Sequence, residues 1–431
     1  MRSICLYFKV HQPIRLRKFR FFDIGNESYY YDDYNNELIL RRVIENCYLP
    51  ANKLILDLIN KYQGRFRVSF SISGTAIDQF KIFAPEVLES FKELAATGHV
   101  EFLAEPYAHS LAAVKDQTEF RKQIETHTAE IESLFGKKPE VFSNTDQIYS
   151  DKIGALVAEM GYKAILAEGS SHVMKWRSPN YLYSNAINKE LTVMLKNDML
   201  SDDIAFRFSN KHWVGWPLTA QKYVSWLNKI PKHEKIVNLF IDYETFGERQ
   251  KAETGIFNFL ETLPLNVCRK SDFQFQTFSE ALNHHECISI LNMPEPTSCA
   301  DHERDLSAWL GNELQKDAFE NLYELSEQIL HCTDRNLLKD WQYLQTSDHF
   351  YYMSTKHHSD GNIHSILNPY NSPYEAFLNY SNILNDFTLR LNRKVRVKTL
   401  DMNMVNKDES LPNPHKSSAK KTHKASNSNI F

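Results

Sequence analysis

The sequence predicts an α/β barrel of about seven or eight strands, followed by a helical region. Two patterns favour this class. Short apolar runs of strand length recur up to about residue 285, and stretches with apolar residues at helical spacing lie between them. Alternating strands and helices are typical of a parallel sheet covered by helices. The 431 residues suffice for a barrel, which commonly takes about 250 residues, and for a smaller second domain.

Seven apolar runs are the expected strands of the barrel. Three of them follow Gly64, Gly98 and Gly161, and a glycine at such a place typically ends the preceding helix. The clearest amphipathic helices are expected at 84–98 and 116–136. Three strands are expected after those glycines, within the stretches 63–74, 97–105 and 160–168, and the others at 3–10, 140–145, 191–197 and 235–242.

Polar residues follow most of these strands. In a closed β/α barrel the carboxyl ends of the strands meet at one face, where active sites lie. A doubly wound sheet would also collect ligands at strand ends, but usually with a Gly-rich phosphate loop. The sequence has no such loop, so we expect a barrel domain at 1–285. The residues at its strand ends are His11, Gln12, Ser73, Glu105, Asn144, Asp146, Glu168, Asp242 and Glu244.

A helical region is expected at 286–400. Apolar residues recur at helical spacing from Leu306 to Leu330 and again within 372–393. The last segment, 401–431, is rich in Lys, Ser, Asn and Pro and poor in apolar residues, which predicts a disordered tail.

Composition narrows the class of function. A formal charge of -4 gives no strong field toward nucleic acid or a membrane surface, so neither is an expected partner. The 13% aromatic residues would suit carbohydrate faces as well as a core. Six scattered cysteines lack Cys-x-x-Cys spacing and indicate reduced thiols, and the first apolar run is too short for a secretory signal. We therefore expect a cytoplasmic protein.

Acidic residues dominate the strand ends and indicate carboxylate chemistry. Glycoside hydrolysis needs one protonated and one ionised carboxyl across the scissile bond, and Asp146 and Asp242 are the best pair. If the strand continues past Asp242, Glu244 shares its face, and repulsion would raise the pKa of one of the two carboxyls. The alternatives are that such acids cap helices or form ion pairs within loops.

Histidines offer two interpretations. His11 and Gln12 could hydrogen-bond sugar hydroxyls, although a histidine at a strand end is often structural. A metal site, as in metal-dependent barrel deacetylases, would draw on other histidines. The sequence lacks the His-x-x-x-His spacing and an acid-acid stretch after the first strand, so no metal and no cofactor are expected. The histidines concerned are His99, His109, His349, His357 and His358.

An ordered set of motifs resembles glycoside hydrolase family 57, in its α-amylase and α-amylase-like branch. The likeness covers about residues 1–395. It rests on "FKVHQPIR", "GHVEFLAEPYAHSL", "VFSNTDQIY", "LFIDYETFGERQ", "AWLGNELQKDAF", "SDHFYYM" and "SPYEAFLNY".

The resemblance implies an incomplete (β/α)7 barrel followed by a helical bundle that contributes to the cleft. It also implies a retaining mechanism on α-glucans without an obligatory metal. By position, Asp242 matches the acid/base, and Asp146 stands at the position of the nucleophile. The remaining matches are expected to bind substrate, namely His11, Glu105, His109, Asp348 and Trp309, with Trp309 equally interpretable as a core residue. Gln12 and Glu244, chosen for their place at the strand ends, are also expected to bind substrate.

Asp146 departs from the family pattern, because active members carry Glu at this position. Aspartate keeps the charge but loses one methylene, which widens the gap between the two carboxyls. We expect an α-amylase-type hydrolase acting on α-1,4-glucan, weakened by this change. The alternatives are a catalytically impaired glucan-binding protein and a 4-α-glucanotransferase or branching enzyme.

Overall fold

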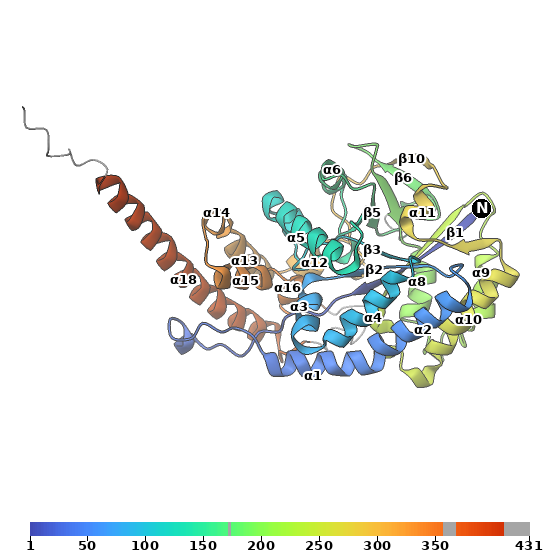
Figure 1. Ribbon diagram of the computed structural model, residues 1–431, viewed down its shortest axis with the longest axis horizontal. Helices are drawn as coiled ribbons and strands as arrows, with labels where there is room; N and C mark the ends of the chain where they lie inside the picture. The colour runs from blue at the N-terminus through green and yellow to red at the C-terminus, as the bar shows by residue number, and fades with distance from the viewer. Residues whose placement is uncertain (171–173, 357–367, 409–431) are drawn as a thin grey trace, which may run out of the picture.

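Two five-stranded sheets form the centre of the protein in a computed structural model that describes residues 1–170, 174–356 and 368–408 (Figure 1). In the first sheet the order is β3 (Val100–Phe102), β2 (Val68–Ile72), β1 (Arg2–Val10) and β8 (Ile236–Asp242), and β9 (Phe273–Phe275) also pairs with β1. In the second sheet the order is β10 (Cys287–Leu291), β6 (Leu182–Asn185), β7 (Thr192–Leu195), β5 (Ala164–Ala167) and β4 (Val141–Ser143).

The sheets approach each other at two places. An isolated parallel bridge pairs Ala104, just after β3, with Phe142 of β4, and another pairs Lys196, just after β7, with Asn238 of β8. All pairs of named strands are parallel except β6 with β7. The predicted α/β class with parallel strands is confirmed, and each of the seven expected strands is present.

Three short strands were not expected from the sequence. β6, β9 and β10 have three to five residues each. β9 has only three residues, and β10, which is mostly exposed, lies beyond the expected barrel boundary at residue 285.

β1 shows why these runs form strands and how they place polar groups. Its alternate residues Ile4, Leu6, Phe8 and Val10 pack into one apolar cluster against the surrounding helices. The opposite face carries Cys5 and Tyr7, which belong to a second apolar cluster inside the sheets. Because side chains alternate along a strand, Lys9 continues this inner face.

Helices cover the outer faces of the sheets (Figure 1). The expected helices at 84–98 and 116–136 correspond to α4 (Pro85–Ala96) and α5 (Gln117–Phe135). Gly136 ends α5 with a positive φ of 75°. The other helices of this part are α1 (Asp33–Val43), α2 (Leu49–Lys61), α3 (Gly74–Phe83), α6 (Asp151–Glu159), α8 (Asp198–Ala205), α9 (Ala220–Leu227), α10 (Ile256–Lys270) and α11 (Phe278–Leu282).

The helical region after the sheets differs from the prediction in two respects. The single periodic stretch from Leu306 to Leu330 is divided into three helices. Gly311 and Asn312 separate the first two, and Asn312 caps the second. The last helix runs to Asp408, so the first eight residues of the predicted disordered tail are helical, and 409–431 lie outside the described residues. The helices are α12 (Ser307–Leu310), α13 (Glu313–Tyr323), α14 (Ser326–Leu330), α15 (Arg335–Leu344), α16 (Ser347–Tyr351) and α18 (Pro373–Asp408).

α18 packs against α13, α14 and α15 and then extends beyond them (Figure 1). Within the described residues, no helix has the length and apolar character needed to cross a membrane.

Candidate active site

A cavity of about 520 Å³ opens where the carboxyl ends of the strands meet. Eight of the nine site residues predicted from the sequence line it, which places residues from six separate parts of the chain around one space. The eight are His11, Gln12, His109, Asp146, Asp242, Glu244, Trp309 and Asp348. The ninth, Glu105, is buried behind His109.

Asp146 is held by a short turn rather than by a strand. It follows β4 within a 3-10 turn (Thr145–Gln147) and adopts a left-handed conformation, with φ 44° and ψ 34°. Its carbonyl accepts a hydrogen bond of 2.9 Å from the backbone N–H of Cys299. This conformation is uncommon for a residue other than glycine, and such strain is typical of functional sites.

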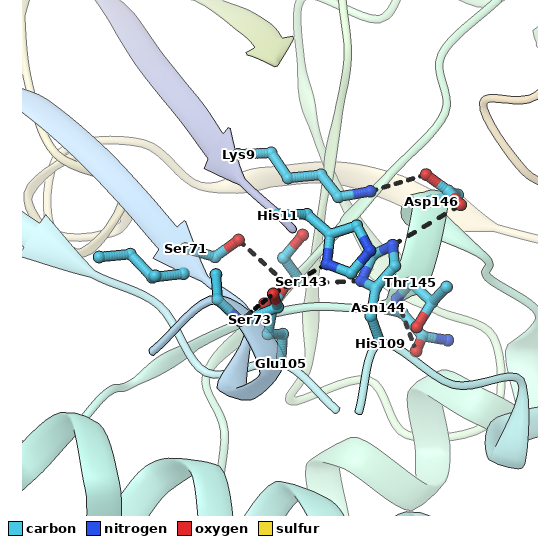
Figure 2. A network of polar contacts seen from close by, with 12 residues as sticks. Lys9, His11, Ser71, Ser73, Glu105, His109, Ser143, Asn144, Thr145 and Asp146 are labelled. Carbon is cyan, nitrogen blue, oxygen red and sulfur yellow. Dashed lines mark hydrogen bonds and ion pairs between the residues drawn. The ribbon is translucent and has the colours of Figure 1, made fainter. Parts of the chain in front are cut away.

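Both carboxylate oxygens of Asp146 face protein groups (Figure 2). Lys9 Nζ donates to Oδ1 at 2.7 Å, and His109 Nε2 lies 3.7 Å from Oδ2. Burial alone would raise the pKa of Asp146, but Lys9 and His109 outweigh it and hold that pKa well below its ordinary value. Asp146 is therefore ionised, as a nucleophile requires.

Asp242 ends β8 and forms an ion pair with Arg249, with 2.6 Å between Oδ2 and Nη1. Burial alone would raise the pKa of Asp242, but the charges of Arg249 and Lys9 outweigh burial and hold that pKa below its ordinary value. Lys9 lies opposite Asp242 in the pairing of β1 with β8, so its ammonium lowers the pKa of both Asp146 and Asp242.

Glu244 does not share the strand face of Asp242 as expected, because β8 ends at Asp242 and a 3-10 turn (Tyr243–Thr245) follows. Its carboxyl accepts a hydrogen bond from Tyr48, whose hydroxyl also accepts from Gln12 at 3.0 Å. Burial, and secondarily the charge of Asp242, raise the pKa of Glu244. Of the carboxyls of Asp242 and Glu244, the one whose pKa is raised is therefore that of Glu244.

The buried His109 lies between Asp146 and the buried Glu105 (Figure 2). His109 Nδ1 lies 4.0 Å from Glu105 Oε2, which also accepts from Ser71 at 3.2 Å. Burial raises the pKa of Glu105 to about 8, against the influence of Lys9. Burial, with the neighbouring His11 and Lys9, lowers the pKa of His109 to about 3. At neutral pH both groups are uncharged.

His11 joins the sheet to the helical region. Its Nδ1 lies 2.8 Å from Ser73 Oγ and its Nε2 lies 2.9 Å from Asp348 Oδ2 on α16. The ring centroids of His11 and His109 are 4.0 Å apart. Burial opposes ionisation of Asp348, but His11 outweighs it and keeps the pKa of that carboxyl below its ordinary value. His11, directly after β1, and Asp348 of the helical region are therefore in direct contact.

Trp309 offers little surface to a ligand. It borders the cavity but is only 2% exposed, and it packs in the apolar cluster of the helical region. Phe206, directly after α8, also lines the cavity and is 38% exposed. Among the Tyr, Phe and Trp residues that line the cavity, Phe206 is therefore the most exposed, and the sequence analysis did not select it.

Several charged residues of the cavity were also missed. Lys9 had a signal, since a lysine within an otherwise apolar strand, two residues before the strand-end His11, needs a polar partner nearby. A second group surrounds Lys196, whose Nζ lies 2.9 Å from Asp202 Oδ1 and 3.9 Å from the buried Glu168. Lys196 follows β7 directly, Asp202 lies on α8, and Glu168 follows the neighbouring strand β5, so the packing of these elements brings the three residues together.

The histidines considered for a metal site lie apart. His349 is buried with its Nε2 3.1 Å from the carbonyl of Tyr343, and His99 packs against Gly64. His357 and His358 lie outside the described residues. In the part of the chain that the structure describes, no group of three or more His, Cys, Asp or Glu side chains is arranged to hold a metal ion.

A comparison with models of protein families identifies the family of this chain. A model described as glycosyl hydrolase family 57 matches residues 5–294. The chain belongs to glycosyl hydrolase family 57. The family expected from the motifs is confirmed, and with it the general class of glycoside hydrolases.

Relatives of this family 57 protein include a candidate alpha-amylase of Methanocaldococcus jannaschii, which is 38% identical over 418 residues, covering 94% of this chain and 88% of the relative. A solved family 57 branching enzyme of Thermococcus kodakaraensis has a TM-score of 0.67 at 14% identity, covering 91% of this chain and 90% of that chain. A 4-alpha-glucanotransferase of Thermococcus litoralis has a TM-score of 0.55 at 16% identity and covers 82% of this chain. This chain spans half of that enzyme's length. The two structural similarities are similarities of fold.

Proposed function

We propose that this family 57 protein is an α-amylase-type hydrolase that cleaves α-1,4-glucan by a retaining mechanism, with low turnover. The observation that carries the proposal is that Asp146 and Asp242 line the same cavity, with Lys9 ion-paired to the first and paired with the second across neighbouring strands. The similarity to a candidate alpha-amylase over 94% of the chain supports the choice of substrate.

Each carboxyl has a separate task in this mechanism. Asp242 gives a proton to the leaving glycosidic oxygen while Asp146 attacks the anomeric carbon and forms a glycosyl-enzyme intermediate. Asp242 then takes a proton from water, whose oxygen attacks the anomeric carbon and releases Asp146. Sugar hydroxyls would be bound by the remaining polar side chains that line the cavity, namely His11, Gln12, His109, Glu244 and Asp348.

The proposal includes the finer architecture. The strands β1, β2, β3, β4, β5, β7 and β8 would form an incomplete (β/α)7 barrel, supported by the two bridges between the sheets. The helices from α12 onward would form the bundle that contributes to the cleft, supported by the contact of Asp348 with His11.

Low turnover follows from the length of the Asp146 side chain. A retaining pair of carboxyls is typically about 5 to 5.5 Å apart. A carboxyl that is one methylene short stands back by roughly 1.5 Å, and an error of about 1 Å can cost on the order of a hundredfold in rate. The hydrogen bond from Cys299 to the Asp146 backbone opposes a compensating shift of the chain.

A turnover assay with parallel binding measurements tests the proposal. Wild type, Asp242→Asn and Asp146→Asn are incubated with a series of maltooligosaccharides, and the products are separated by length. We expect slow shortening of the substrate by wild type, at least a hundredfold less by either variant, and glucan binding by all three proteins. If none of the three binds an α-glucan, the substrate assignment is wrong.

Two other outcomes identify the alternatives. Binding without turnover in wild type would indicate a glucan-binding protein that has lost catalysis, which the shortened Asp146 favours. Products longer than the substrate would indicate a branching enzyme or 4-α-glucanotransferase, which the fold similarity to such enzymes supports.

A further inference from the structure

Lys9 occupies an unusual place for a lysine. It lies on the inner face of β1 and its side chain is only 12% exposed. Burying an ammonium is costly unless it is paired. Here the ammonium forms an ion pair with Asp146, and a second carboxylate, Asp242, lies at the paired position of the neighbouring strand β8.

The ion pair also fits the short side chain. Lys9 Nζ meets Asp146 Oδ1 at 2.7 Å, a normal charge-assisted hydrogen bond, while the Asp146 backbone is fixed by Cys299. A glutamate at 146 would extend about 1.5 Å further from the same backbone. It would have to displace the ammonium or fold back from it.

We propose that Lys9 is a positioning residue that joins Asp146 and Asp242 into one unit, and that Lys9 and the short Asp146 are matched to each other. The role in catalysis rests on the proposed function, whereas the coupling of the two carboxylates does not. Lys9 itself does not touch the reacting atoms, and it acts through the carboxylates that it holds.

The charged surroundings show why the ammonium matters. Asp146 faces Lys9 and His109, and Asp242 faces Arg249, Lys9 and Asp146. Without Lys9, the two carboxylates would face each other with fewer cations between them. Their mutual repulsion would then favour a proton on one of them.

Asp348 is a further charged group that acts on Asp146, whereas three other groups near Lys9 are neutral at neutral pH. Burial raises the pKa of the Cys299 thiol, and Glu105 and His109 are uncharged near pH 7. Loss of the Lys9 charge is therefore felt mainly by Asp146 and Asp242.

The first test measures protonation directly and needs no turnover. Carboxyl carbons of aspartate are labelled with 13C, and the Asp146 and Asp242 signals are identified by their loss in Asp146→Asn and Asp242→Asn. NMR titration then compares wild type with Lys9→Met, which is similar in length but neutral, and with Lys9→Arg. We expect the midpoint of at least one carboxyl to rise by more than one pH unit in Lys9→Met and by much less in Lys9→Arg.

Lys196→Met is the matched control. Lys196 is a second buried lysine of the same cavity, but its ion pair is with Asp202. Its replacement should leave the Asp146 and Asp242 midpoints within a few tenths of a unit. If Lys9→Met shifts neither midpoint, or if Lys196→Met shifts them equally, the coupling by Lys9 is wrong.

The second test addresses the match in length. Turnover is measured for Asp146→Glu, Lys9→Met and the double variant. We expect Asp146→Glu alone to give little gain, and the double variant to exceed it by at least tenfold. Equal or higher activity of Asp146→Glu alone would refute the match. If no variant turns over glucan, the proposed function fails and the titration still decides the coupling.

Discussion

Arg249 Nη1 lies 2.6 Å from Asp242 Oδ2, so the proposed acid/base is paired with a cation that stabilises its ionised form. A general acid must carry its proton to act. The ion pair therefore opposes the first step of the reaction in the unliganded protein, and substrate binding has to work against it.

This ion pair predicts a pH dependence. Because the pKa of Asp242 lies below its ordinary value, the protonated fraction falls as pH rises through that low pKa. We expect kcat/KM, which reports the free enzyme, to decrease with rising pH from the acidic range. In Arg249→Met the pKa of Asp242 rises, so the decrease should move to higher pH.

Measurement of kcat/KM between pH 4 and 8 checks this expectation. Arg207→Met is the control, since Arg207 forms its ion pair with Asp203, which does not line the cavity. An unchanged profile in Arg249→Met would show that Arg249 does not govern the protonation of Asp242.

Glu105 predicts a pH dependence of stability. Its pKa is about 8 in the folded protein, raised by burial, and about 4.3 in an unfolded chain. Between these values the folded state keeps a proton that the unfolded state has lost, so the free energy of unfolding falls as pH rises, by at most about 1.4 kcal/mol per pH unit. Glu105→Gln removes this contribution.

Urea unfolding of both proteins at pH 5, 6.5 and 8 measures the effect. The stability of Glu105→Gln relative to wild type should increase over this range by a few kcal/mol. A difference that stays constant from pH 5 to 8 would mean that Glu105 is already ionised in the folded protein.

Local patterns gave most of the fold and most of the cavity residues. The seven expected strands were visible because each is an apolar run, and strand ends located His11, Asp146 and Asp242 without further information. The division of 306–330 at Gly311 was missed because the apolar spacing continues across it.

The partners of these residues could not be read from the sequence. Arg249 meets Asp242 through the shape of the loop between them, and Lys196 meets Asp202 because α8 folds back close to the end of β7. No local pattern encodes either arrangement. The same limit explains why the sequence analysis selected Trp309, although Phe206 is the ring exposed at the cavity. Helical spacing and residue type favoured the tryptophan, but only packing determines which ring faces the cavity.

Phe206 and Trp309 should therefore respond differently to truncation. Phe206→Ala removes an exposed ring from the cavity wall and should raise KM for longer glucans about fivefold, which corresponds to about 1 kcal/mol of stacking. Trp309→Ala removes a buried ring and should lower the free energy of unfolding by about 3 to 5 kcal/mol.

Kinetics and urea unfolding of both variants separate these effects. Phe206→Tyr should retain the KM of wild type, and Phe22→Ala, which truncates an exposed ring away from the cavity, should leave both quantities unchanged. A large rise in KM for Trp309→Ala with normal stability would restore Trp309 as the stacking residue.

Gly247 determines the shape of the loop that carries Arg249. Its φ is 105°, and its N–H donates to the carbonyl of Gln250 at 2.9 Å, which closes the turn. A Cβ at this position would lie 1.9 Å from the backbone oxygen of Asn46. Gly247→Ala therefore combines backbone strain with a collision against a backbone atom that cannot move away easily.

Gly255→Ala separates the two causes. Gly255 has a similar positive φ of 84°, but a Cβ there would meet nothing within 4 Å. Its loss of stability should reflect backbone strain alone, about 1 to 2 kcal/mol, while Gly247→Ala should lose at least twice as much and shift the pH profile as Arg249→Met does. Equal losses in urea unfolding would show that the loop moves to accept the methyl group, and Arg249 would then keep its hold on Asp242.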